Sequence, residues 1–287
     1  MKYLYIVLLG LLIVVSCKKK EEPVKEWVFA RTIQLDGVNP IGIAEVDGKL
    51  WLSDGDHNRL VQIDAKGKIE QTVDSLERPM HIDVSESILF VPQYGGDDIF
   101  NYNPVDPLSQ LPVFDYPKDS LDAPAGIAVL GKEKAIADFY NNRILYTDGA
   151  VWISIGKEGK AEGEFYYPTD VQLTDSLIWV ADAYNNRVQA FDKQGNFVKM
   201  MGQDQKMNAA TGIFVSDEEV FVTDFENDRV LVFDHRGTLK QELRDGIDKP
   251  TDMVITNGIL YVINYRKGEI KIFQLKTKKV TDKKQSQ

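Results

Sequence analysis

The sequence predicts an all-β fold built from six similar units that close into a ring. Three observations predict it: short runs of β-branched and aromatic residues, a repeat with a constant period, and an unpartnered alternating segment near the N-terminus. The runs are about four to eight residues long and are separated by Gly, Asn, Asp and Pro, which is typical of strands joined by tight turns. After the first two dozen residues, no segment shows a convincing helical period.

Self-comparison of the chain shows the repeat. Pro40 and Pro250 are five units apart, and the 210 residues between them give a period of 42 residues. In each unit an apolar run ends in an acidic or polar residue, and after a short loop an Arg begins another run. The proline position of the six units is held by Pro40, Pro79, Pro124, Pro168, Ala210 and Pro250. Six units with four short strands each predict a six-bladed β-propeller with four-stranded antiparallel blades.

Residues 24–274 resemble NHL repeats, and the Asp-x-x-Asn-Asn-Arg segments are the most specific element of the resemblance. The resemblance implies a six-bladed propeller. The last unit stops after Phe273 and lacks an outer strand, whereas the alternating segment from Trp27 to Leu35 has no partner. We expect the N-terminal strand to complete the last blade and close the ring, which removes an exposed sheet edge. Residues 275–287 are expected to form a disordered, Lys-rich tail.

The N-terminus predicts a lipid anchor. Residues 1–16 combine Lys2 with an uncharged, mostly apolar run, which is shorter than the about 20 residues of a membrane span and is typical of a signal peptide. The run from Val14 to Cys17 resembles the lipobox of bacterial lipoproteins, which implies cleavage before Cys17 and a diacylglycerol on its thiol. An unmodified secretory signal is the alternative. Residues 17–23 would then be the lipidated cysteine and its charged tether.

The lipobox resemblance implies a bacterial cell-envelope protein, anchored in the outer membrane and facing either the periplasm or the cell surface. Cys17 is the only cysteine, so a disulfide framework is excluded. The formal net charge of −10 and the pI near 4.9 argue against a nucleic-acid partner. The expected partners are the membrane, through the lipid on Cys17, and an envelope protein, a peptide or a glycan.

An Asp and an Arg recur at the same offset in four units, on either side of a short hairpin loop. A pair repeated in this way is expected to be structural rather than catalytic. The pairs are Asp54 and Arg59, Asp138 and Arg143, Asp182 and Arg187, and Asp224 and Arg229.

Function is better sought where the units differ. Two residues after the proline position, the six units carry Gly42, His81, Gly126, Asp170, Gly212 and Asp252. The innermost strands of a propeller surround its channel, so we expect the His and the two Asp to converge near one mouth of it. These side chains could bind a divalent cation such as Ca²⁺, or a polar ligand. Alternatively, they bind channel waters or neighbouring loops.

Aromatic residues occupy the hairpin loops after the repeated Asp, on the same expected face. A ring of aromatic side chains around a polar centre would suit a peptide or a sugar, although such residues can also pack between blades. The candidates are Tyr94, Phe139, Tyr140, Tyr184, Phe225 and Tyr265.

The resemblance to NHL propellers also raises the question of catalysis, because the family includes peptidyl-amidoglycolate lyases. Their zinc-binding histidine directly follows the repeat proline, and that position here lacks histidine in all six units: Ile41, Met80, Ala125, Thr169, Thr211 and Thr251. We therefore expect a membrane-anchored binding protein that acts through its loop-bearing face. The alternatives are a metal-dependent lyase or hydrolase at the pore mouth and a structural subunit of an envelope complex.

Overall fold

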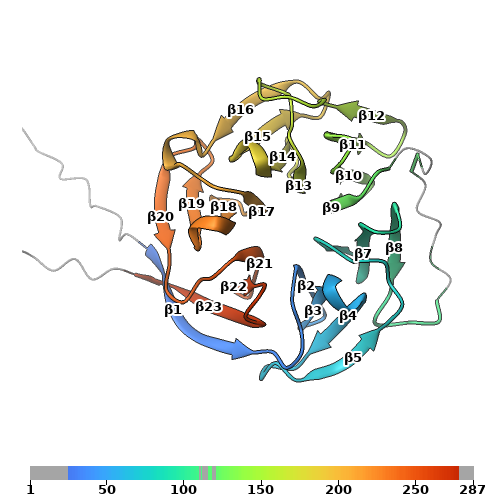
Figure 1. The fold of residues 1–287 in the computed structure, drawn as a ribbon, viewed down its shortest axis with the longest axis vertical. Helices are drawn as coiled ribbons and strands as arrows, with labels where there is room; N and C mark the ends of the chain where they lie inside the picture. The colour runs from blue at the N-terminus through green and yellow to red at the C-terminus, as the bar shows by residue number, and fades with distance from the viewer. Residues whose placement is uncertain (1–24, 110, 112–115, 118–120, 278–287) are drawn as a thin grey trace, which may run out of the picture.

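The computed structural model describes residues 25–109, 111, 116–117 and 121–277. Its strands form six antiparallel sheets arranged radially around a central axis, as Figure 1 shows. The predicted all-β, six-bladed propeller is confirmed. Within the described residues five sheets have four strands and the second has three. The signal peptide, Cys17, the tether and residues 278–287 lie outside the described residues.

The blades are built as follows. Blade 1 contains β2 (Gly42–Val46), β3 (Lys49–Asp54), β4 (Arg59–Ile63) and β5 (Ile69–Val73), and blade 2 contains β6 (Asp83–Ser85), β7 (Ile88–Gln93) and β8 (Asp98–Tyr102). Blade 3 contains β9 (Pro124–Leu130), β10 (Glu133–Asp138), β11 (Arg143–Thr147) and β12 (Trp152–Ile155), and blade 4 contains β13 (Pro168–Leu173), β14 (Leu177–Asp182), β15 (Arg187–Asp192) and β16 (Phe197–Met201). Blade 5 contains β17 (Ala210–Val215), β18 (Glu219–Asp224), β19 (Arg229–Asp234) and β20 (Leu239–Leu243), and blade 6 contains β21 (Pro250–Thr256), β22 (Ile259–Asn264), β23 (Glu269–Thr277) and β1 (Lys25–Gln34).

The N-terminal strand β1 closes the ring as expected, since it pairs antiparallel with β23 as the outer strand of blade 6. Trp27 also ties β1 to blade 5. Its backbone N–H donates to Gln241 Oε1 at 2.9 Å, and its ring meets Phe221 edge-on at 5.7 Å between centroids. The strand β23 continues to Thr277, which pairs with Lys25. The propeller therefore extends three residues beyond the predicted boundary at 274, because the long β1 gives these residues a partner.

The hydrophobic core lies between neighbouring blades. Each of six clusters of buried apolar side chains joins two adjacent sheets, so burial depends on blade-to-blade contact rather than on one central core. Trp51 and Trp179, for example, are only 1% exposed at two of these contacts. Successive residues of a strand face opposite sides of the sheet. Alternate residues are therefore buried against the blade on one side, and the residues between them against the blade on the other side.

Glycine alternates with a larger residue around the axis because the backbones approach closely there. A Cβ added to Gly42 would stand 2.5 Å from the Met80 carbonyl oxygen in the next blade. A Cβ on Gly212 would stand 2.2 Å from the Thr251 carbonyl oxygen. Blades 1, 3 and 5 thus need glycine where blades 2, 4 and 6 carry His81, Asp170 and Asp252.

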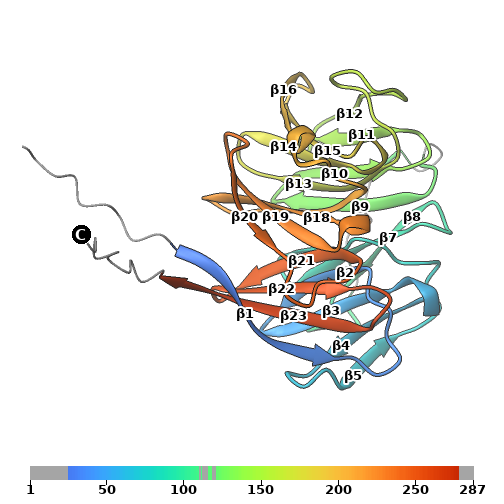
Figure 2. The same ribbon diagram turned by 60° about the vertical axis from the view of Figure 1, so that its left-hand side comes forward.

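The two faces of the ring differ in what they carry. The innermost strands begin on the face that also holds short 3₁₀ turns after the repeated Asp, which we call the loop-bearing face. These turns include η1 (Gly55–His57), η3 (Ala183–Asn185) and η5 (Phe225–Asn227), and η4 (Gln203–Gln205) follows β16. The strand β1 begins on the opposite face, at Lys25, beside the end of β23 (Figure 2). No helix among the described residues is long and apolar enough to cross a membrane.

Candidate functional site

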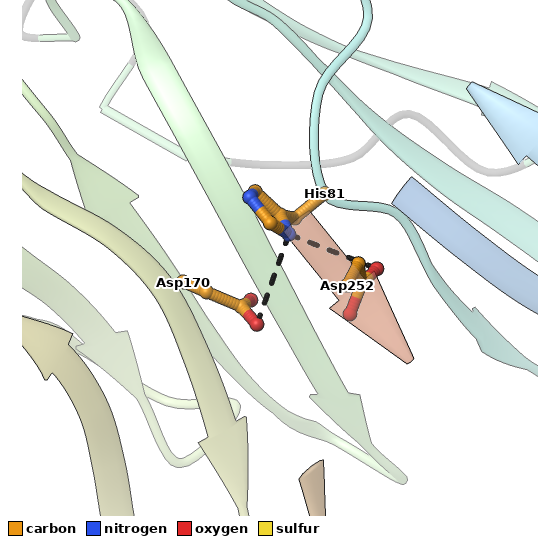
Figure 3. A group of neighbouring side chains, drawn as sticks. All are labelled: His81, Asp170 and Asp252. Carbon is orange, nitrogen blue, oxygen red and sulfur yellow. Dashed lines mark ion pairs between the residues drawn. The ribbon is translucent and has the colours of Figure 1, made fainter. Parts of the chain in front are cut away.

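Three side chains from alternate blades meet in the channel, and we call them the channel triad: His81, Asp170 and Asp252. Figure 3 shows the imidazole of His81 facing both carboxylates. His81 Nδ1 lies 3.8 Å from Asp170 Oδ2 and 3.7 Å from Asp252 Oδ2. All three residues are buried, with His81 3% exposed and each Asp 5% exposed. The structure therefore brings together the three residues at which the repeat breaks.

Backbone hydrogen bonds hold each carboxylate of the triad in place. Asp170 accepts the N–H of Val171 on Oδ1 and that of Ile213, in the next blade, on Oδ2, both at 2.8 Å. Asp252 makes the same two hydrogen bonds two blades further round the ring. Its Oδ1 accepts the N–H of Met253 at 2.7 Å, and its Oδ2 accepts that of Ile43, in the next blade, at 3.0 Å. Each Asp thus links two blades and presents the same Oδ2 atom to His81.

His81 lacks such a partner on its Nδ1 atom. The distances of 3.7 and 3.8 Å exceed a hydrogen bond. Nδ1 is among the buried side-chain atoms that have no hydrogen-bond partner in the part of the chain that the structure describes. A buried nitrogen of this kind costs free energy unless something else binds it.

Burial and mutual charge shift the pKa values of the triad. Burial lowers the pKa of His81, but the nearby carboxylates of Asp170 and Asp252 raise it by more, so the net shift is upward. Burial raises the pKa of Asp170 to about 7, with a further upward contribution from Asp252 and a downward one from His81. The charge on each of these three side chains therefore depends on the charges of the other two.

A cavity of about 230 Å³ reaches the two carboxylates. Its walls come from the middle and later residues of the innermost strands, among them Glu45, Gln172 and Thr256. The cavity therefore extends from the triad toward the face opposite the 3₁₀ turns. The triad itself lies toward the end of the channel that carries the aromatic turns, since Asp170 is the third residue of β13 and pairs with Ala181, next to the turn after Asp182.

Asp83 is a third carboxylate beside the channel, half-buried, that we did not single out in the sequence. Its Oδ2 accepts the N–H of Val129 in blade 3 at 2.7 Å, its Oδ1 accepts that of Val84, and it lines the same cavity. Burial raises its pKa to about 6, with a smaller contribution from Asp252. A signal was available, since Asp83 and Gln172 are the polar residues four positions after the repeat proline.

The repeated Asp and Arg residues form ion pairs inside their own hairpins. In each pair the Arg Nε donates to the Asp Oδ2, over 2.9, 2.7, 2.8 and 2.6 Å in blades 1, 3, 4 and 5. The four Asp residues are 0% exposed. A turn residue with positive φ precedes each Arg, at Asn58, Asn142, Asn186 and Asp228. The pair and the left-handed residue together define the hairpin.

The aromatic residues gather on one side of the loop-bearing face rather than around it. Their rings touch in series from blade 2 to blade 4, with the Phe139 and Tyr167 rings stacked at 4.8 Å between centroids. Tyr140 and Tyr184 remain 50% and 58% exposed. We call this group the aromatic patch, and it contains Tyr94, Phe139, Tyr140, Tyr166, Tyr167 and Tyr184.

The sequence did not single out Tyr166 and Tyr167, although they directly precede Pro168 at the same end of the strand. The other two aromatic candidates make separate contacts. Phe225 lies under the Lys249 ammonium at 5.6 Å, and the Tyr265 hydroxyl donates to the Asp56 carboxylate. The predicted ring of aromatic side chains is thus replaced by a patch over blades 2–4.

Fold and site together define a six-bladed propeller with a carboxylate and imidazole cluster in its channel. Among solved structures, the chain is similar to virginiamycin B lyase from Staphylococcus aureus, in a catalytically inactive form with quinupristin. The TM-score is 0.62 at 16% identity, over 91% of this chain and 90% of that one. It is also similar to a streptogramin B lyase structure, with a TM-score of 0.56 at 17% identity over 89% and 88% of the two chains.

A third similar structure is the computationally designed Ika8 protein, with a TM-score of 0.50 at 12% identity over 80% of this chain and 70% of that one. No protein-family model and no curated protein matches the sequence. At these identities the likeness establishes the propeller fold and leaves function to the site.

Proposed function

We propose that the protein is a lipid-anchored, extracytoplasmic NHL-repeat propeller of the bacterial cell envelope that binds a peptide, glycan or partner protein through its aromatic patch. The observation that carries the proposal is the exposure of Tyr140 and Tyr184 at the centre of a contiguous group of rings. Exposed tyrosines offer large apolar faces with a polar tip and lose little conformational entropy on binding, which is why they are enriched in recognition surfaces.

The direction of the chain supports the same function. Lys25, the first described residue, lies on the face opposite the aromatic patch, because it pairs with Thr277 at the end of β23 away from the turns. If Cys17 carries lipid, the eight steps from Cys17 to Lys25 span at most about 28 Å when fully extended. A tether leaving from this side would direct the aromatic patch away from the bilayer, where a ligand has free access.

Binding is tested with the purified full-length protein on arrays of envelope glycans and of peptides. The double variant Tyr140→Ser with Tyr184→Ser should weaken capture of any bound class by about tenfold or more, since such anchors dominate interfaces. Val151→Ser, an exposed apolar residue outside the patch, is the matched control and should bind as the wild type does. If patch variants retain full affinity, the patch is not the binding surface. If envelope proteins co-purify equally with the wild type and with the patch variants, a structural subunit is favoured instead.

The anchor is tested separately by labelling cells with radioactive palmitate. The wild type should take up label and sediment with membranes, whereas Cys17→Ala should lose the label and appear in the soluble envelope fraction. An unlabelled wild-type protein would contradict lipidation and leave the binding proposal untouched.

A metal-dependent lyase or hydrolase is a second candidate, favoured by the fold likeness to a virginiamycin B lyase and a streptogramin B lyase. Its reaction would have to take place at the channel triad. Because His81 is 3% exposed and the adjoining cavity measures about 230 Å³, only a small substrate fits there. Loss of lyase activity on small substrates in His81→Gln, with ligand capture unchanged, would support this candidate over the binding protein.

A further inference from the structure

We propose that the channel triad is a metal site that binds one divalent transition-metal ion, of the Zn²⁺ or Mn²⁺ class, between His81 Nδ1 and the Oδ2 atoms of Asp170 and Asp252. The inference is independent of the proposed binding through the aromatic patch, because the triad and the patch share no residue. It rests on the arrangement of three buried donor atoms that face one another and do not touch.

The spacing of the donors fits a shared ion. Three ligand atoms bound to one ion at about 2.1 Å stand about 3.0–3.6 Å apart for bond angles between right-angled and trigonal. The two distances from His81 Nδ1, 3.8 and 3.7 Å, lie just above this range. One ligand atom from each of the three residues lies within 4.8 Å of the other two. A contraction of a few tenths of an ångström would bring His81 Nδ1 to the required spacing from each Oδ2.

The absence of a hydrogen bond to His81 Nδ1 favours a ligand between these groups. Each carboxylate already accepts two backbone N–H groups, so its position does not depend on His81. His81 Nδ1 is buried and has no hydrogen-bond partner within the described part of the chain. The backbone has therefore built a preformed pair of anionic acceptors, and the imidazole completes a donor set rather than a hydrogen-bond network.

Charge favours a cation over a water molecule in this gap. Two carboxylates lie within the same buried space, and the carboxylate of Asp83 lines the cavity beside them. With His81 neutral, a water molecule in this gap would leave the charge of the two carboxylates uncompensated away from solvent, which is costly. A divalent cation would neutralise the two triad carboxylates and bind the imidazole nitrogen as well.

The donor types select the class of metal. Calcium takes about 6–8 oxygen ligands and rarely uses nitrogen, whereas imidazole with carboxylates suits Zn²⁺, Mn²⁺ or Fe²⁺. The triad offers one nitrogen and two carboxylates, so this geometry supports a transition metal rather than the Ca²⁺ suggested by sequence. The cavity next to Asp170 and Asp252 would supply room for water as a further ligand.

Equilibrium dialysis with single metals tests the site. The purified protein is first stripped with a chelator and then titrated separately with Zn²⁺, Mn²⁺ and Ca²⁺. We expect about one equivalent of Zn²⁺ or Mn²⁺ per chain, with Ca²⁺ weaker by about tenfold or more. At 100-fold excess over Kd, the bound metal should raise the Tm by about 5–10 °C. Substituted Co²⁺ should give visible absorption bands that change in His81→Gln.

The variants Asp170→Asn and His81→Gln should each weaken metal affinity by about 100-fold or more, since both remove a direct ligand. Asp83→Asn is the matched control, because Asp83 also bridges two blades from inside the cavity but is not in the triad. Its affinity should stay within a few-fold of the wild type. Circular dichroism shows whether each variant folds.

Three results would overturn the proposal. The first is a wild-type protein that binds no metal above the level of Asp170→Asn. The second is calcium binding as tight as that of zinc and manganese, which would contradict the donor argument. The third is an equal loss of affinity in Asp83→Asn, which would indicate diffuse electrostatic attraction instead of a defined site. The wild-type titration decides the matter even if a variant fails to fold.

Discussion

The repeated Asp–Arg pairs and the channel triad both bury carboxylates beside a basic group, yet they are built differently. In blade 4, Asp182 accepts hydrogen bonds from Arg187, Asn185, Gln189 and the Tyr166 N–H. In the channel, His81 Nδ1 faces two carboxylates but has no hydrogen-bond partner in the described part of the chain. The repeated group is complete within its own blade, whereas the unrepeated group is incomplete without a ligand. The residues that repeat in the blades thus stabilise the fold, and the residues at which the repeat breaks form the candidate site.

The largest effect that we expect is the loss of stability when one of the repeated Asp–Arg pairs is broken. Arg187→Ala removes a side chain that also donates to the Lys160, Ala161 and Glu164 carbonyls, and it leaves Asp182 buried. We expect a loss of about 3–5 kcal/mol in the free energy of unfolding, measured with urea. Arg59→Ala, whose side chain is 21% exposed against 7% for Arg187, should cost less. Equal losses would contradict the link between burial and stability.

The next effect tests whether glycine makes room for the triad. In Gly126→Ala the new Cβ would stand 2.8 Å from the Thr169 carbonyl oxygen and 2.9 Å from the Asp170 Cα. Neither backbone atom can move without shifting the blade, so we expect a loss of about 1–3 kcal/mol. Gly95→Ala, where the nearest atom is at 3.4 Å, serves as control. A neutral Gly126→Ala variant would show that the axis is less crowded than the structure indicates.

A smaller effect is expected from the triad. Asp170→Asn leaves the Ile213 N–H without its anionic acceptor, but it also removes one of two neighbouring buried charges. Since these contributions oppose each other, the metal-free variant should lose about 1 kcal/mol or less. Urea unfolding in the presence of a chelator measures this. A loss as large as that of Arg187→Ala would make the triad structural and erase the contrast.

The smallest effect is a pH dependence in an exposed, repeated turn. The Asn196 side chain and the N–H groups of Asn196 and Gln194 bind the Asp192 carboxylate and lower its pKa below the usual 3.8. The lowered pKa means that Asp192 stabilises the fold fully above pH 3.8 and loses this contribution as the pH falls through the folded-state value. Wild type and Asp192→Ala should therefore differ in Tm at neutral pH and converge in strong acid. A constant difference would contradict the linkage.

Much of the candidate site could be predicted because the repeat aligns equivalent positions. His81, Asp170 and Asp252 stand out only against Gly42, Gly126 and Gly212, and the shared position places all six at one level of the channel. Asp83 was missed because its position is polar in few units. The one-sided aromatic patch could not be predicted, because Phe225 and Tyr265 occupy equivalent turns and differ only in their neighbours, Lys249 and Asp56.

The sequence by itself determined the period of 42 residues, the number of blades and the closure of the ring by β1, because these follow from strand patterns along one chain. Only the tertiary structure decided that the channel cavity extends away from the aromatic patch and that His81 Nδ1 faces two carboxylates without touching them. These features depend on distances between blades far apart in sequence. A repeat pattern fixes which residues share a level, whereas packing between blades fixes how close their atoms come.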